Sequence, residues 1–402
     1  MVNIMKSKKL FLSILLLSVI YISFIALGLP DAILGSAWNL VREDLNVSLG
    51  SLGIMTVVIY IMSIISTYNA PRLLRLLQTK WITFVSILFT GSALIVMSRV
   101  GEFYQILFFA IPLGIGAGAI DVSLNHYLAK NYKASHMNYL HSFYGIGVTL
   151  GPSIMASTLQ NNSWRLGYVI VGSILLVIAF LVLISFKLWK KETDAEKEHH
   201  EHINLKDALK TKKVINSLVI FLIYVHVESL LGAWISSYIY LEKGVSYAVA
   251  ALFATTYYLG LTLGRLLSGI FSHKINSTKL IIIGTSLMLA GAVLLIFNYT
   301  SLVFYFIIVG ILGIGSGPIF PNMMFLNNEK FSEKYLSKVI SLQMVIGYMG
   351  FGLLTPLAGL LFDQISISLY PYILLFSMSV LTLMIYLYIK HQKLQKSASS
   401  LI

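Results

Sequence analysis

Three carboxylic acids lie in the interior of long apolar segments, whereas the other thirteen of the sixteen acids lie between such segments or at their ends. The three are Asp31, Asp121 and Glu228. Asp31 precedes Arg42 by eleven residues and Asp121 precedes Lys130 by nine, so helices would place them roughly 16 and 13 Å from a membrane surface. A charged group inside hydrocarbon is costly, so each of these acids indicates a functional site.

The chemistry that these acids suggest is proton transfer. We find no Lys or Arg at the membrane depth predicted for these acids, so we expect none of the three to have an ion-pair partner. An unpaired carboxyl group in a low-dielectric medium favours its neutral form, and it can take up a proton on one side and release it on the other. We predict proton coupling by Asp31 and Asp121. The alternative is a protonated acid that only hydrogen-bonds a neighbouring helix, and for Glu228 substrate binding or packing are both open.

Other polar side chains in these segments predict a solute site. Asn125 follows Asp121 by four residues and Tyr224 precedes Glu228 by four, so each pair shares one helix face. Amide, hydroxyl, carboxyl and ring groups together suit a small polar solute such as a sugar, although Tyr and Trp are also common at membrane interfaces. The predicted substrate-binding residues are Asn125, His141, Tyr144, Tyr224, Glu228, Trp234 and Asn322.

The elements that must position these residues are membrane-spanning helices. The chain is 57% hydrophobic and 11% charged, against about 25% charged in an ordinary soluble domain. Its apolar runs are about 20 residues long, the length that crosses the hydrocarbon core as a helix. We therefore predict an all-α membrane protein with twelve spans, at residues 10–38, 51–76, 81–98, 103–126, 138–159, 165–188, 214–240, 247–271, 279–297, 301–324, 337–361 and 369–389.

The basic residues predict the topology. The net charge of +13 could indicate nucleic-acid binding, but Lys and Arg lie in alternate loops, as the positive-inside rule requires. With both termini in the cytoplasm, 25 of the 29 basic residues fall on the cytoplasmic side. We predict a multi-pass protein of the bacterial inner or plasma membrane that binds no nucleic acid. The first apolar run lacks a small-residue cleavage site, so we expect a retained span rather than a signal peptide.

Enzymatic and metal chemistry find little support in the residues. The chain has no cysteine, so disulfides, zinc thiolates and thiol nucleophiles are excluded. His199, His200 and His202 lie in a charged segment that we interpret as a solvated linker rather than a metal site. The glycines of residues 113–120 and 312–319 lie inside apolar spans, where they allow close helix packing instead of nucleotide binding. We predict no enzyme activity, no cofactor, and a monomer whose partners are the solute, protons and the lipid bilayer.

An internal repeat divides the chain into two halves. Residues 31–35 align with 228–232, and 113–120 with 312–319, at offsets of 197 and 199. We predict six-helix bundles at residues 1–188 and 214–402, joined by a cytoplasmic linker at 189–213, with the solute site between them. Phe320 stands where Asp121 would be in the second half, so we expect proton handling mainly in the first.

Several stretches resemble the fucose permease branch of the major facilitator superfamily, the fucose–galactose–glucose:proton symporters. They are residues 28–38, 114–125, 136–147, 232–238, 264–265 and 317–321. The resemblance implies the major facilitator fold, with two pseudo-symmetric six-helix bundles. It also implies that Asp31 and Asp121 match the family's proton-coupling and sugar-binding acids, and that Asn125 matches its substrate asparagine. The fourth-span acid is Asp here instead of the family's Glu, and the loop at residues 69–80 lacks the acid and glycines of the superfamily's loop motif.

The predicted function is proton-coupled symport of a sugar or similar small polar solute by alternating access. The alternative is proton-coupled efflux of a drug or metabolite, because Gly147, Gly151 and Pro152 partly match a fifth-span motif of drug:proton antiporters. A membrane sensor would need a sizeable soluble region, and the longest predicted loop has about 25 residues.

Overall fold

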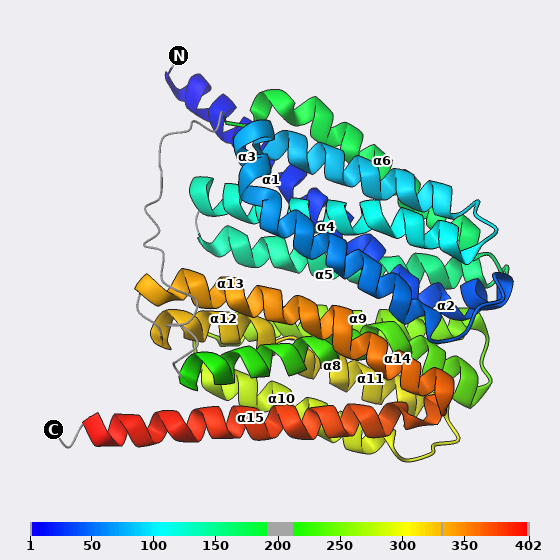
Figure 1. Ribbon diagram of the computed structural model, residues 1–402. Helices are drawn as coiled ribbons and strands as arrows, with labels where there is room; N and C mark the ends of the chain where they lie inside the picture. Colours follow the sequence, from blue (N-terminus) through cyan, green and yellow to red (C-terminus); the bar gives the residue numbers. More distant parts are fainter. Residues whose placement is uncertain (1, 133, 191–211, 331–332, 400–402) are drawn as a thin grey trace. The chain divides into compact units, whose positions relative to one another are not determined.

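The computed structural model describes residues 2–132, 134–190, 212–330 and 333–399, and this part of the chain is helical without a β-strand (Figure 1). The prediction of an all-α membrane protein is confirmed for this part of the chain. The α-helices are α1 (Val2–Asp31), α2 (Ile33–Asp44), α3 (Ser51–Met97), α4 (Phe103–Asn131), α5 (Ala134–Leu159), α6 (Trp164–Ile184), α8 (Lys212–Lys243), α9 (Tyr247–Phe271), α10 (Ser277–Leu295), α11 (Leu302–Ser316), α12 (Ile319–Lys330), α13 (Glu333–Met349), α14 (Thr355–Gln364) and α15 (Tyr370–Ser399).

Short helical segments of other types complete the description. A 3₁₀ helix, η1 (Ser185–Leu188), extends α6, and η3 (Ile367–Leu369) precedes α15. A single π-helical turn, η2 (Gly350–Leu354), joins α13 to α14 inside the predicted eleventh span. π-helical turns are rare inside longer helices and occur often at functional sites.

Eleven segments of the described chain are long and apolar enough to cross a membrane. The remaining predicted span, residues 138–159, lies in α5, which is helical but less apolar. His141, Ser142 and Thr149 lower its mean hydropathy, and these include the polar groups from which the solute site was predicted. The polar residues that lower the hydropathy of α5 below that of the eleven apolar segments are therefore consistent with a solute-binding helix.

Four spans differ in detail from the predicted ranges. The first continues to Asp44 and is interrupted at Ala32, directly after Pro30 and Asp31. Pro30, two residues before this interruption, has no backbone N–H to donate within the helix. The second and third spans merge into α3, and the chain turns at Gln78 alone, with φ of 58°. The tenth span is divided into α11 and α12 around Gly317.

The chain divides into two compact units. The first comprises Met1–Lys197 with Val245–Thr255, and the second Glu198–Gly244 with Thr256–Ile402. The beginning of α9 thus belongs to the first unit, which the sequence does not indicate. Residues 191–211, which include most of the predicted linker with His199, His200 and His202, lie outside the described residues.

In the first unit, α3 packs along α4 and against α6, while α1 packs along α5. Asp44 at the end of α2 ties three helix ends together, because it forms an ion pair with Arg165 and accepts a 3.0 Å hydrogen bond from Trp164 Nε1. Arg165 Nη2 also donates to the Val100 carbonyl at 3.1 Å. These contacts fix the start of α6 against the ends of α2 and α3.

In the second unit, α10 packs against α11 and α15, and α8 packs against α13 and α15. Buried aromatic residues fill the spaces between these helices. Tyr238 of α8 stacks on Tyr370 of α15 with ring centroids 5.0 Å apart, and both rings are buried. The central position of α8 places its polar residues inside the unit.

Candidate functional site

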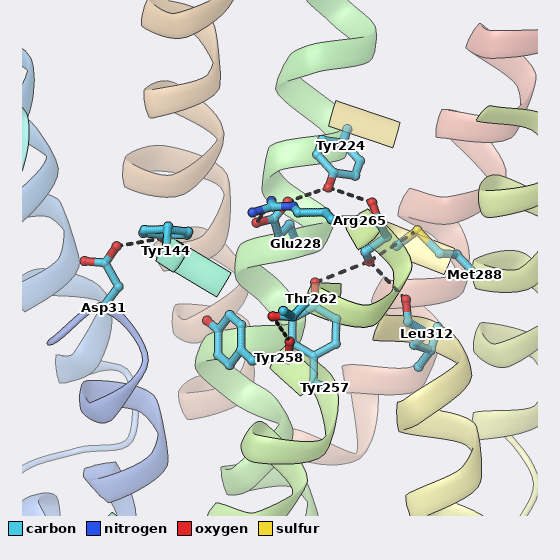
Figure 2. Close-up of polar contacts among 11 residues, drawn as sticks. Asp31, Tyr144, Tyr224, Glu228, Tyr257, Tyr258, Thr262, Arg265, Met288 and Leu312 are labelled. Atoms are coloured by element: carbon cyan, nitrogen blue, oxygen red, sulfur yellow. Dashed lines mark hydrogen bonds and ion pairs between the residues drawn. The ribbon is translucent and has the colours of Figure 1, made fainter. Parts of the chain in front are cut away.

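Asp31 is the last residue of α1, at the interruption that separates α1 from α2. Its side chain is exposed, although the residue lies well inside the first span. The Tyr144 hydroxyl of α5 donates a 2.8 Å hydrogen bond to Asp31 Oδ2 (Figure 2). The structure therefore brings a predicted proton-coupling acid together with a predicted substrate-binding residue of the same unit.

The contact between Asp31 and Tyr144 depends on close approach of α1 and α5. A Cβ atom on Gly28 would lie 2.5 Å from the Tyr144 carbonyl oxygen, and one on Gly147 would lie 2.4 Å from the Ile25 carbonyl oxygen. Only glycine leaves room for the facing backbone at both positions. We conclude that these glycines set the separation at which the Tyr144 side chain reaches Asp31.

Asp121 and Asn125 form the second predicted pair. Asn125 Nδ2 lies 2.8 Å from Asp121 Oδ1 and 2.8 Å from the Asp121 backbone carbonyl, and both side chains are half-buried in α4. The prediction that the two share a helix face is confirmed. No ion pair among the described residues includes Asp31 or Asp121.

His141 lies half-buried on α5, one turn before Tyr144. Its ring meets Phe24 of α1 edge-on, with ring centroids 5.7 Å apart. The residue is therefore on the side of α5 that faces α1, as Tyr144 is.

Glu228 contradicts the expectation that all three acids lack a cationic partner. In the second unit, Arg265 Nη2 of α9 lies 3.4 Å from Glu228 Oε1 of α8. Arg265 is six residues from the end of α9. The positive-inside rule places it among the 25 basic residues predicted on the cytoplasmic side. The prediction failed because a long arginine side chain can reach along and across a helix, so the depth of its Cα does not give the depth of its guanidinium.

Two tyrosines and a serine surround the ion pair. The buried Tyr224 hydroxyl donates to Glu228 Oε2 and also lies 3.0 Å from the Ser316 carbonyl oxygen of α11. The Tyr257 hydroxyl of α9 lies 3.3 Å from Ser316 Oγ. Figure 2 shows Glu228 between Tyr224 and Arg265. We call Tyr224, Glu228, Tyr257, Arg265 and Ser316 the Glu228 cluster.

Gly317 places Arg265 in this cluster. A Cβ atom on Gly317 would lie 2.4 Å from the backbone N of Arg265 and 2.4 Å from the carbonyl C of Gly264. The end of α11 therefore lies directly against the α9 backbone. The prediction that glycines of residues 312–319 allow close helix packing is confirmed at this contact.

Two predicted substrate-binding residues, Trp234 and Asn322, have packed surroundings. Trp234 is 1% exposed and packs edge-on against Phe362, with ring centroids 5.3 Å apart. Asn322 is also buried, and its Nδ2 donates to Ser268 Oγ and to the Pro318 carbonyl, each at 2.7 Å. These contacts favour packing and helix–helix attachment as their roles.

Sequence reasoning missed Arg265, Tyr257 and Ser316 as members of a polar cluster. A signal for Arg265 existed, because it lies inside a predicted span and beside Gly264. Nothing in the sequence marked Tyr257 or Ser316, since hydroxyl residues are common in such helices. Within the described ranges, no group of three His, Cys, Asp or Glu side chains could hold a metal ion.

Comparison with known proteins gives the family and related transporters. The sequence profile of the Major Facilitator Superfamily matches residues 20–238 and 217–400. The chain is 22% identical over 362 residues to the glucose/mannose transporter GlcP of Bacillus subtilis, covering 86% of each chain. It is 23% identical over 333 residues to bypass of stop codon protein 6 of Saccharomyces cerevisiae, covering 75% of this chain and 67% of that protein.

Solved structures share the fold at low sequence identity. A D-xylose–proton symporter superposes with a TM-score of 0.74 at 14% identity, over 93% of this chain and 97% of that one. The nucleoside transporter NupG superposes with a TM-score of 0.73 at 11% identity, over 94% and 98%.

Proposed function

The chain belongs to the Major Facilitator Superfamily, and we propose that it couples proton movement to the uptake of a sugar or similar small polar solute by alternating access. As a multi-pass member of this family it is a secondary transporter and not an enzyme. The names of two similar proteins, a glucose/mannose transporter and a D-xylose–proton symporter, support a sugar and a proton as the transported species.

The observation that carries the proposal is the environment of Asp31. Its carboxyl group is exposed at a helix interruption inside a membrane span, and its hydrogen-bond donor is the neutral Tyr144 hydroxyl. Because no ion pair among the described residues includes Asp31, its carboxyl group can gain and lose a proton as its access to the two sides changes. Asp121, with Asn125 as its donor, provides a second acid of this kind in the same unit.

The predicted solute groups support a sugar. Asn125 uses Nδ2 toward Asp121, which leaves its Oδ1 to accept a hydrogen bond from a solute hydroxyl. Tyr144 and His141 lie on the neighbouring α5. In the second unit Tyr224 and Glu228 supply further hydroxyl and carboxyl groups. Movement of two bundles, residues 1–188 and 214–402, would open these groups to alternate sides, with both termini cytoplasmic in a bacterial plasma membrane.

Reconstituted full-length protein tests the proposal. Proteoliposomes with an inwardly directed proton gradient should accumulate a labelled sugar from a panel of hexoses and pentoses, and an uncoupler should abolish the accumulation. Asp31→Asn should lose driven uptake, whereas Asp363→Asn, which changes an exposed acid of α14, should keep it. Accumulation that persists with the uncoupler would overturn proton coupling. Proton-driven export in place of uptake would support efflux of a drug or metabolite.

A further inference from the structure

Arg265 and Glu228 form an ion pair in the second unit. The proton coupling proposed for Asp31 and Asp121 of the first unit does not involve this pair. Their side chains are 14% and 13% exposed, so both are largely enclosed but not fully buried. A charged side chain within a span is costly, and neutralising it with an opposite charge lowers that cost. The pair also lies beside hydroxyl groups, which a purely apolar packing contact would not require.

The geometry of the pair is loose. The Nη2–Oε1 separation of 3.4 Å is longer than the about 2.7–2.9 Å of a strong charge-assisted hydrogen bond. Glu228 directs its other oxygen, Oε2, toward the Tyr224 hydroxyl. Arg265 and Glu228 therefore do not form the two parallel hydrogen bonds that a guanidinium and a carboxylate can make when they face each other.

We propose that Arg265 binds a carboxylate group of the transported solute, and that Glu228 takes up one proton when the solute carboxylate replaces it at the guanidinium. The solute class is then a sugar acid, a sugar-like molecule with one carboxylate. The proposal rests on the transport function proposed above and specifies its substrate.

Charge balance connects the solute to the proton. The empty pair carries one positive and one negative charge and is neutral as a whole. A solute carboxylate that pairs with Arg265 adds one negative charge, so neutrality is restored when Glu228 binds one proton from water. No covalent bond forms or breaks in this exchange, and the proton is released when the solute leaves and Glu228 returns to Arg265. A neutral sugar would leave the ion pair intact and carry no such additional proton.

The neighbouring groups suit this exchange. The Tyr224 hydroxyl lies within hydrogen-bond distance of both Glu228 Oε2 and the Ser316 carbonyl oxygen. It has one proton to donate, so it can turn to the Ser316 carbonyl when Glu228 becomes protonated. Glu228 in its neutral form can then donate to the tyrosine oxygen, and no buried polar atom loses its partner.

The test uses two solutes of the same ring, D-glucose and D-glucuronate, with full-length protein in proteoliposomes. We expect wild-type protein to take up glucuronate with at least about tenfold preference, and to move one more proton per glucuronate than per glucose. Arg265→Gln should lower the ratio of glucuronate to glucose uptake about tenfold or more, because it removes a hydrogen-bonded charge. Glu228→Gln should keep glucuronate binding and lose the additional proton.

A single substitution leaves one charge unpaired in the membrane and can prevent folding. The double variant Arg265→Gln/Glu228→Gln removes both charges, and thermal unfolding in detergent would establish that it is folded. Its ratio of glucuronate to glucose uptake should fall to about one. Glucuronate uptake that is absent in wild-type protein, or a preference unchanged in the variants, would overturn the inference. Proton-driven glucose uptake in the same vesicles would then leave the proposed function standing, whereas uptake of neither compound and of no other sugar in the panel would overturn both.

Discussion

The Tyr144 hydroxyl donates a 2.8 Å hydrogen bond to Asp31 Oδ2 and so joins α5 to the interruption between α1 and α2. The two residues are 113 positions apart in the chain. One is a candidate proton carrier, and the other comes from the helix that carries several of the predicted solute-binding groups. In the proposed transport cycle, a change in the protonation of Asp31 would alter the strength of this hydrogen bond and so connect the proton to the solute site.

The first prediction concerns this pair of side chains. Asp31→Asn should abolish gradient-driven uptake, and Tyr144→Phe should lower it about tenfold by removing one hydrogen bond. In the double variant, solute exchange without a gradient should fall no further than in Asp31→Asn alone, since contacting residues are not additive. Tyr104→Phe, at a hydroxyl-bearing side chain that is 68% exposed on α4, is the control. Additive losses would show that the two residues act independently.

The second prediction concerns Asp121 and Asn125, which are joined on α4. Asp121→Asn should abolish driven uptake and leave exchange, because the amide keeps the shape of the carboxyl group and cannot carry the proton. Asn125→Ala should raise KM about tenfold, as expected for the loss of a hydrogen bond to solute, and keep the dependence on the gradient. Asn131→Ala, whose amide bonds the Tyr127 carbonyl near the end of α4, is the control. Normal driven uptake in Asp121→Asn would exclude this acid from coupling.

The helices of this chain were largely predictable because hydropathy and length alone determine whether a segment can span a membrane. The interior acids Asp31 and Asp121 were predictable for the same reason, since their cost in hydrocarbon makes them conspicuous in the sequence. Their partners at four-residue spacing, such as Asn125, followed from helix geometry. All of these inferences use only local sequence.

The partners of Glu228 could not be predicted in this way. Arg265 is 37 residues from Glu228, and its contact depends on how α9 lies against α8 and α11. The substrate-binding role expected of Trp234 and Asn322 rested on residue type alone. The direction in which each side chain points depends on how its helix packs, which residue type does not give. Trp234 meets Phe362, and Asn322 meets Ser268, both far along the chain.

The third prediction separates packing from solute binding at Asn322. Asn322→Ala removes the buried hydrogen bonds to Ser268 and to the Pro318 carbonyl, so it should lower the free energy of unfolding by about 1–3 kcal/mol. Its KM for solute should stay within about twofold of the wild-type value, since its buried amide group already bonds Ser268 of α9 and the Pro318 carbonyl. Thermal unfolding in detergent and uptake kinetics measure the two effects. A raised KM with unchanged stability would instead place Asn322 in the solute site, as the sequence had suggested.

The fourth prediction tests the close contact that positions Arg265. Gly317→Ala places a Cβ atom 2.4 Å from the Arg265 backbone N and from the Gly264 carbonyl carbon, so the end of α11 must move away from α9. We expect a loss of about 1–3 kcal/mol in the free energy of unfolding, as for other overpacked positions. The displacement should also separate Arg265 from Glu228.

Gly269→Ala is the matched control for Gly317→Ala, because a Cβ atom on Gly269 of α9 meets nothing within 4 Å. Alanine is favoured over glycine inside a helix by about 1 kcal/mol, so this variant should be as stable as the wild type or more so. Thermal unfolding of both variants compares the stabilities, and the uptake of glucose and glucuronate compares the solute preference. If Gly317→Ala matched Gly269→Ala in both measurements, the α9–α11 contact would have no part in holding Arg265 beside Glu228.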